Sequence, residues 1–207
     1  MLWHSLLMEL SAIMTSPTRT KPEPPQLADH PVLDMLNTVC MHEGERHDFW
    51  QTDTDVVDWL VRAGWLAGSD ESDRGDQALL MAARDLRGIV QVLVAQRKAG
   101  DRLSLEALNG YLAEAESYPQ LVLGEGREPS LVRVRPRHSA RQLLAPLAEA
   151  AAEMLVGADF SRIHTCANPE CILWFYDRTK SRRRRWCSTS TCGNRHKVAA
   201  YRKRHRR

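Results

Sequence analysis

The sequence lacks the motifs that mark most enzymes. It has no Walker-type glycine loop, no His-Glu-x-x-His motif, no Ser/His/Asp set and no paired carboxylates at helical spacing. Gly124 and Gly126 lack the strand-to-helix context of a phosphate-binding loop, so they indicate a turn. We therefore expect a protein that is not an enzyme.

Nothing in the sequence indicates secretion or a membrane span. The apolar stretch at residues 1–13 is too short to cross a bilayer, and it has neither a basic region nor a small-x-small cleavage site. Four prolines at residues 15–26 predict that residues 1–26 form a disordered leader. The sequence leaves open which methionine starts the protein: Met1, Met8 or Met14. We expect no membrane contact and a cytoplasmic, nucleoid-associated location.

Cysteine is scarce, but four of the five cysteines form a pattern. Cys166 and Cys171 make one pair, Cys187 and Cys192 another, with the same four-residue gap and 15 residues between the pairs. Four thiolates satisfy a tetrahedral zinc ion, and so short a segment needs such support to fold. Two disulfides are the alternative, which a reducing cytosol disfavours. The spacing predicts one structural Zn²⁺ held by these four residues.

Positive charge is concentrated at the C-terminal end. Residues 160–207 contain 14 Lys and Arg against two acidic residues, a net charge of +12, and the rest contains 15 against 24, a net charge of −9. Zinc-bound thiolates would leave the basic end at about +10. An acidic body joined to a basic tail is typical of a protein that binds a polyanion.

Two short motifs resemble those of a known family. Cys192-Gly193-Asn194-Arg195 is the signature of the CGNR zinc fingers, and Arg185-Trp186-Cys187, Lys197 and Tyr201-Arg202 fit the pattern around it. The family usually places an ABATE domain before this finger. Leu33-Asp34-Met35-Leu36-Asn37-Thr38 is similar to the opening of that domain, with Met35 in place of an aromatic residue. The resemblance covers about residues 27–207 and implies a stress-induced transcription regulator.

Hydrophobic periodicity predicts a helical body before the finger. Helices are expected at 52–66, 77–99, 103–115 and 139–157, and a β-hairpin with strands at 121–123 and 131–135. The apolar run 32–41 fits a short strand or a first helix. We expect an α+β protein. It has a helix-dominated N-terminal domain with a β-hairpin over 27–157 and a small treble-clef-like zinc finger with four cysteine ligands over 158–207.

Individual side chains in the body carry their own predictions. Gly88 predicts a close helix crossing, Ser104 is a candidate helix cap, and Cys40 is expected as a small buried apolar residue. His42 and His47 are expected in a polar loop that faces solvent.

Three polar residues interrupt the apolar run near the start of the domain: Asp34, Asn37 and Thr38. They fit capping and turn hydrogen bonds on one interpretation. On the other, they line a pocket for a small-molecule effector, and we keep them as the candidate ligand pocket.

The finger is expected to begin with a hairpin whose arms are 163–166 and 172–176, followed by a third strand at 184–187. Ser190 or Thr191 should cap a final helix that ends near residue 204, with Val198 and Tyr201 on its inner face. The aromatic residues fit a finger core better than a base-stacking surface: Trp174, Phe175, Tyr176 and Trp186.

Side chains next to the cysteines have expected partners. Asn194 should hydrogen-bond the first cysteine loop or a sulfur atom, and Arg195 should pair with Asp177 or with a phosphate. Four cysteines already fill the zinc shell, so His196 should face solvent or phosphate. Gly193 should allow a close backbone approach.

Two basic elements could straddle a DNA backbone: a charged arm at residues 180–185 and the final helix. Arg195 and Arg202 are the candidates for base edges, since arginine binds guanine bidentately. The nucleic-acid-binding candidates are Lys180, Arg182, Arg183, Arg184, Arg185, Arg195, Lys197, Arg202, Lys203 and Arg206.

These observations favour a DNA-binding transcription regulator whose N-terminal domain senses a small molecule or stress. Double-stranded DNA is the expected partner, an unidentified effector the expected ligand, and a homodimer fits recognition by two units. The alternatives are an RNA-binding or ribosome-associated zinc protein and a protein-interaction adaptor.

Overall fold

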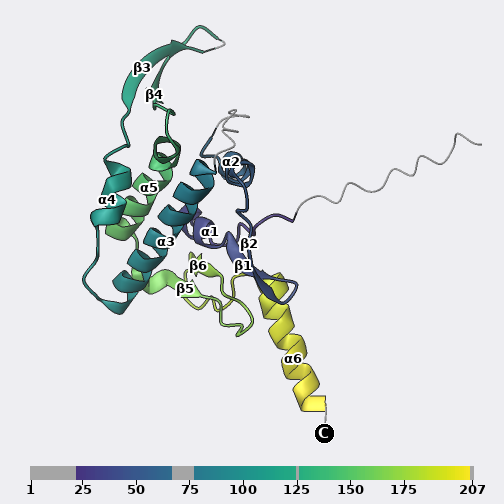
Figure 1. Ribbon diagram of the computed structural model, residues 1–207. Helices are drawn as coiled ribbons and strands as arrows, with labels where there is room; N and C mark the ends of the chain where they lie inside the picture. Colours follow the sequence, from purple (N-terminus) through teal and green to yellow (C-terminus); the bar gives the residue numbers. More distant parts are fainter. Residues whose placement is uncertain (1–21, 67–76, 125, 206–207) are drawn as a thin grey trace, which may run out of the picture.

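The computed structural model describes residues 22–66, 77–124 and 126–205. A helical body carries three two-stranded sheets, and the last helix stands away from it (Figure 1). The mixed helix and strand content confirms the predicted α+β class. The elements in chain order are α1 Pro31–Leu36, β1 Val39–His42, β2 Glu45–Asp48, α2 Asp53–Arg62, α3 Ala78–Ala99, α4 Glu106–Leu112, β3 Tyr118–Leu123, β4 Pro129–Val134, α5 Ala140–Gly157, a 3-10 turn at Phe160–Arg162, β5 Ile163–Thr165, β6 Trp174–Tyr176, a π-helical turn at Thr189–Gly193, and α6 Asn194–His205.

Some predictions fall on residues outside the described ranges. These are the three possible start residues and the leader up to residue 21. Residues 22–26, at the end of the predicted leader, form neither helix nor strand. Among the described residues, no helix is long and apolar enough to cross a membrane.

Local capping explains where the helices begin. In α2 the Thr52 side chain accepts a hydrogen bond from the Asp55 N–H at 3.2 Å, while the Asp55 carboxylate accepts from the Thr52 N–H at 2.9 Å. Ser139 caps α5 in the same position. Ser104 is not a cap, which corrects the prediction: α4 begins after Leu105, and Ser104 hydrogen-bonds the Gln96 side chain instead.

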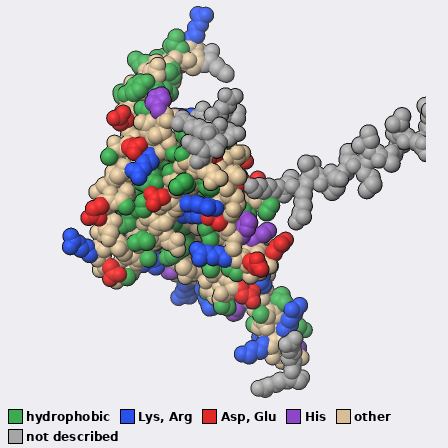
Figure 2. Space-filling model, viewed as in Figure 1, with side chains coloured by type: hydrophobic (Ala, Val, Ile, Leu, Met, Phe, Trp, Pro, Cys, Tyr) green, Lys and Arg blue, Asp and Glu red, His purple; other side chains and the backbone are tan. Residues whose placement is uncertain are grey.

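The hairpin of β3 and β4 projects from the body (Figure 1). Its register places Leu121 opposite Leu131 and Leu123 opposite Pro129, so these side chains share one face. Leu121 is 73% exposed and Leu131 70%. Hydrophobic side chains are visible along this projection in Figure 2. The predicted hairpin is confirmed, and one of its faces is apolar and uncovered.

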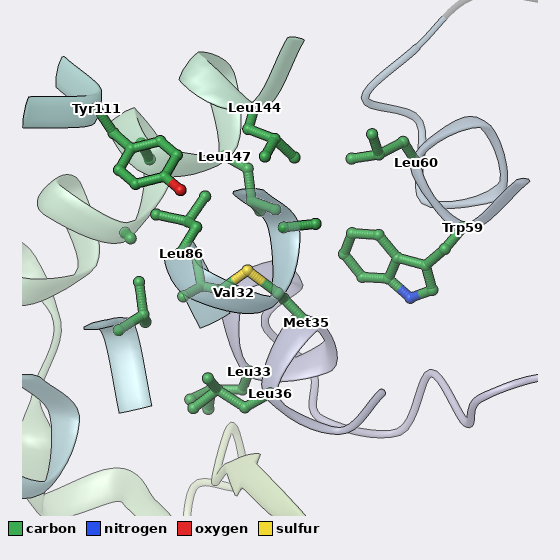
Figure 3. Packing of buried hydrophobic residues seen from close by; sticks show 14 of the residues in the cluster. Val32, Leu33, Met35, Leu36, Trp59, Leu60, Leu86, Tyr111, Leu144 and Leu147 are labelled. Atoms are coloured by element: carbon green, nitrogen blue, oxygen red, sulfur yellow. The ribbon is translucent and has the colours of Figure 1, made fainter. Parts of the chain in front are cut away.

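A single large core runs from the body into the finger. Helices α3 and α5 pack against each other, and α1 and α2 add side chains such as Val32 and Trp59 (Figure 3). Ile163 of β5 is fully buried in this core, and Trp174 and Tyr176 of β6 pack on it. The expected boundary near residue 157 therefore separates two sequence segments that share one core.

Gly88 does not mark a helix crossing, so that prediction is wrong. It is exposed on α3, and a Cβ atom added there would meet nothing within 4 Å. The residue instead borders a surface cavity beside β1 and β2.

The run 32–41 contains both of the structures that its pattern allowed, α1 followed by β1. Strand β1 pairs with β2 around a turn at Glu43 and Gly44, whose φ angles are 51° and 90°. His42 and His47 therefore lie in strands, half-buried, and not in a solvent-facing loop as predicted. The His47 ring packs edge-on against Phe49 with 4.6 Å between centroids, because this face of the hairpin covers a small second core.

Candidate metal centre and nucleic-acid interface

Four sulfur atoms gather in the C-terminal segment. The ligand atoms of Cys166, Cys171, Cys187 and Cys192 all lie within 4.8 Å of one another. Cys187 Sγ is 3.7 Å from Cys171 Sγ and 3.6 Å from Cys192 Sγ. Four sulfurs bound at ~2.3 Å to a tetrahedral ion would be separated by similar distances. All five cysteines, each of them in the described part of the chain, are free of disulfides, so the alternative of two bridges is excluded here.

Backbone hydrogen bonds fold the first cysteine pair into a tight loop. The Cys166 N–H donates to Leu173 O at 2.9 Å, which extends the β5–β6 hairpin, and the Cys171 N–H donates to Asn168 O at 2.9 Å. The Asn168 side chain is buried and points its amide at Cys192 Sγ, 3.6 Å away. The role expected of Asn194, a hydrogen bond to sulfur, therefore belongs to Asn168, while Asn194 is exposed.

Cys192 of the second cysteine pair lies on a helical turn, Thr189–Gly193, and Cys187 comes two residues before that turn. Ser188 caps it, accepting from the Thr191 N–H at 3.2 Å, so the predicted cap at Ser190 or Thr191 is wrong. Cys192 sits in this π-helical turn, just before α6 begins. A Cβ at Gly193 would lie 3.4 Å from Trp186 Cδ1, at van der Waals contact, so the backbone passes close to this ring. Residues 184–187 form no strand, although Arg185 O accepts from the Ala167 N–H at 2.8 Å.

The sulfur cluster favours a divalent cation. A hydrogen bond from the Cys187 thiol lowers the pKa of Cys171 to about 5, and the same contact with burial raises the pKa of Cys187. One thiolate thus forms easily and opposes ionisation of its neighbours. A dication removes that repulsion, and four soft sulfur donors suit zinc. The four cysteines would hold one structural zinc ion, as predicted.

Cys40 lies beside this centre without joining it. It is 5% exposed and packs with the four cysteines, Phe49 and Phe175 in the second core. Burial raises its pKa to about 11, which keeps the thiol neutral. The prediction that Cys40 is a small buried apolar residue is confirmed. Its side chain packs β1 against the metal centre.

Arg184 differs from the other basic residues of the arm, because it is half-buried and they are exposed. Its guanidinium donates to Trp186 O, Leu27 O and Cys187 O, pairs with Asp29, and lies 4.4 Å above the Phe175 ring. Its side chain is 19% exposed. Arg184 therefore joins the finger to the N-terminal segment and is not available to a phosphate.

The other basic residues proposed for nucleic-acid binding on the arm and on α6 are all exposed: Lys180, Arg182, Arg183, Arg185, Arg195, Lys197, Arg202 and Lys203. Arg182 pairs with Asp159 at 3.3 Å, and Arg185 lies over the Trp186 ring at 5.2 Å. Arg206 is outside the described residues. Asp177 accepts from Thr179 and from the Arg184 N–H, so its expected pairing with Arg195 is not formed.

Helix α6 buries no side chain over its whole length, Asn194–His205. Val198 is 48% exposed and Tyr201 57%, so the predicted inner face is wrong. The His196 ring packs against Trp186 at a tilt of 36°, with centroids 4.8 Å apart, and is no metal ligand of the cluster. The helix leaves the finger at its first turn and extends into solvent (Figure 1).

The three candidate pocket residues are found in structural hydrogen bonds. Asp34 accepts from the Ala28 N–H at 2.9 Å, and Thr38 Oγ1 donates to Met35 O at 2.7 Å. The Asn37 side chain bonds both backbone groups of Trp174, at 2.9 and 2.8 Å. None of the three lines either of the two surface cavities described for the body. Their role as ligand contacts stays a prediction.

Sequence reasoning missed several residues that shape the site. Asn168 and Arg184 support the metal centre, and Arg87 joins α3 to β2 through Asp48. A signal existed for Asn168 only, as the sole carboxamide between the first two cysteines. Arginine in a charge run carries no pattern that separates a buried residue from an exposed one.

Comparison with known families assigns both halves of the chain. The ABATE family, described as "Putative stress-induced transcription regulator", matches residues 29–158, and the CGNR zinc finger matches residues 162–205. No curated protein matches the chain. The first match covers well over half of the 207 residues. The chain therefore belongs to the ABATE family and carries a CGNR zinc finger behind the ABATE domain.

Proposed function

We propose that the chain is a DNA-binding transcription regulator whose finger contacts double-stranded DNA and whose ABATE domain responds to a small-molecule effector. The observation that carries the proposal is α6, a basic helix that buries none of its side chains. Twelve residues give a rod of ~18 Å. A helix of this kind enters the major groove, which is ~12 Å wide.

The basic residues divide into two groups by position. Arg195 and Arg202 on α6 are proposed to reach base edges, and Lys197 and Lys203 to contact phosphates. The exposed residues of the arm, such as Arg183, are proposed to contact the backbone. Arg184 is left out of this surface, because its guanidinium is occupied within the protein.

A homodimer is part of the proposal, and the β3–β4 hairpin is its surface. A two-stranded hairpin alone is marginally stable in water, and its apolar face is self-complementary because Leu121 and Leu131 pair across it. A second copy stacked on this face would bury both leucines of each chain. Two fingers would then bind one DNA molecule.

Selection of bound sequences from a random duplex pool tests the function. We expect a defined sequence to be enriched with zinc present and no enrichment after chelation. The logarithm of the binding constant should fall linearly with the logarithm of the salt concentration, with a slope of ~0.9 per neutralised phosphate. A preference for structured RNA over every duplex would favour the RNA-binding alternative, and failure to shift any nucleic acid at low salt would favour an adaptor.

A further inference from the structure

A cavity lies where β1 and β2 meet α3, on the side of the sheet away from the zinc finger. Its volume is about 390 Å³, and it is lined by Val39, Arg46, Asp48, Arg84, Arg87, Gly88 and Gln91. Figure 2 shows basic and acidic side chains gathered in this region of the surface. The volume is at the small end of the range for ligand sites.

The cavity is positively charged. Three arginines and one aspartate line it, so the side chains that line the cavity carry a net charge of +2. The Arg87 guanidinium forms an ion pair with Asp48 and donates a hydrogen bond to Thr38 Oγ1 at 2.7 Å. Its side chain is 9% exposed. Arg84 donates to Trp50 O through both Nε and Nη2, its Nε lies 3.3 Å from Asp48 Oδ2, and its side chain is 40% exposed. The Arg46 side chain is exposed at the rim of the cavity.

Gly88 lines the cavity without a side chain. It is one turn after Arg84 on α3, and no atom lies within 4 Å of the position that its Cβ would occupy. Glycine in a helix interior is unfavourable relative to alanine, yet packing does not require it at this position. The missing side chain leaves open space beside Arg84 and Arg87.

The same two-stranded sheet separates this cavity from the zinc centre. Alternation places Val39, Arg46 and Asp48 on the cavity face, and Cys40 and His47 on the other. Cys40 packs on the zinc cysteines. A ligand in the cavity would therefore contact one face of the β1–β2 sheet, and the opposite face of this sheet packs on the zinc finger.

We propose that this cavity binds a small dianion, a phosphate monoester or a dicarboxylate, through Arg46 and Arg84. Arginine recognises both groups through the same pair of parallel N–H donors. The interpretation of this anion as the effector rests on the proposed function. Binding itself does not, since it can be measured on the zinc-loaded chain without DNA.

The experiment titrates the full zinc-loaded chain by calorimetry with inorganic phosphate and, separately, with succinate, at matched ionic strength. Arg46→Gln should weaken binding roughly tenfold, and Gly88→Gln, which fills the cavity without changing charge, should abolish it. The matched controls are Arg102→Gln, an exposed arginine beyond the end of α3, and Val92→Gln, on an exposed position of α3. Both should bind like the parent chain.

The outcomes separate clearly. Binding of one anion alone identifies its class, and a shift of the His47 resonances on saturation supports the route through the sheet. The proposal is overturned if neither anion binds at millimolar concentration, or if both cavity variants bind as the parent does. If the parent chain does not bind DNA, the regulator function is refuted, and the anion site is unaffected by that result.

Discussion

The Asn37 side chain exchanges two hydrogen bonds with the backbone of Trp174, 137 residues further along the chain. Its amide donates to Trp174 O, and its oxygen accepts from the Trp174 N–H. The side chain thereby imitates a neighbouring strand at the edge of β6. This pair connects the ABATE motif directly to the zinc finger.

Replacing Asn37 with alanine should therefore destabilise the protein. Both backbone groups of Trp174 would lose a partner at a buried position, at a cost of about 2–4 kcal/mol. Urea denaturation of the zinc-loaded protein measures this change. Asn37→Asp keeps the acceptor but sets a buried carboxylate against Trp174 O, so it should destabilise the protein at least as much as alanine does. A loss below about 0.5 kcal/mol for the alanine variant would contradict the role.

Removal of zinc should unfold the finger. Zinc contributes on the order of 10 kcal/mol to modules of this kind, and we expect Cys187→Ser to lose the metal. Metal analysis and cobalt substitution, followed by absorption, report the site. Cys40→Ser is the matched control and should retain one ion per chain, because Cys40 lies outside the cluster. Full metal content in the Cys187 variant would refute the ligand set.

Adjacent arginines in the arm should behave differently. Arg184→Gln should cost about 2–3 kcal/mol, because it leaves Asp29 and several carbonyl oxygens without a donor. Arg183→Gln, on an exposed side chain, should leave stability unchanged and reduce the salt slope of DNA binding by about one. Thermal denaturation and a salt titration separate the two effects. Equal stability of the variants would show that the contacts of Arg184 contribute little.

Acid should destabilise the start of α1. His30 Nδ1 accepts from the Val32 N–H at 3.3 Å, and burial, with the nearby charge of Arg178, lowers the His30 pKa. The unfolded chain then binds the proton more readily, so stability should fall as pH drops below about 6.5. His30→Asn retains a capping oxygen without a titrating ring and should flatten this part of the stability curve. An unchanged pH profile would contradict the assignment.

The apolar hairpin face should set the oligomeric state. Leu121→Lys places a charge in the proposed interface and should convert a dimer to a monomer in analytical ultracentrifugation. Val156→Lys, at an 88% exposed position at the end of α5, is the control and should leave the mass unchanged. A parent chain that sediments as a monomer at every concentration would remove the hairpin from the proposal.

The zinc site and the long helices were predictable because local pattern determines them. Thiol spacing and four sulfur donors indicate a metal before any fold is known, and the apolar stripes of α3 and α5 have the helical period. The reach of Arg184 and the open space at Gly88 were not predictable, since both depend on which segments meet in three dimensions. The same holds for Tyr201, whose apolar ring suggested an inner face on a helix that buries no side chain there.

Helix α6 buries none of its side chains in either core. We therefore expect substitutions of its exposed side chains to change the free energy of unfolding little, whereas substitutions of buried side chains in the body should lower it. The residues of this helix that contact a binding partner could then change while the ABATE domain stays the same. This separation would let one scaffold serve many different targets through changes in a dozen positions.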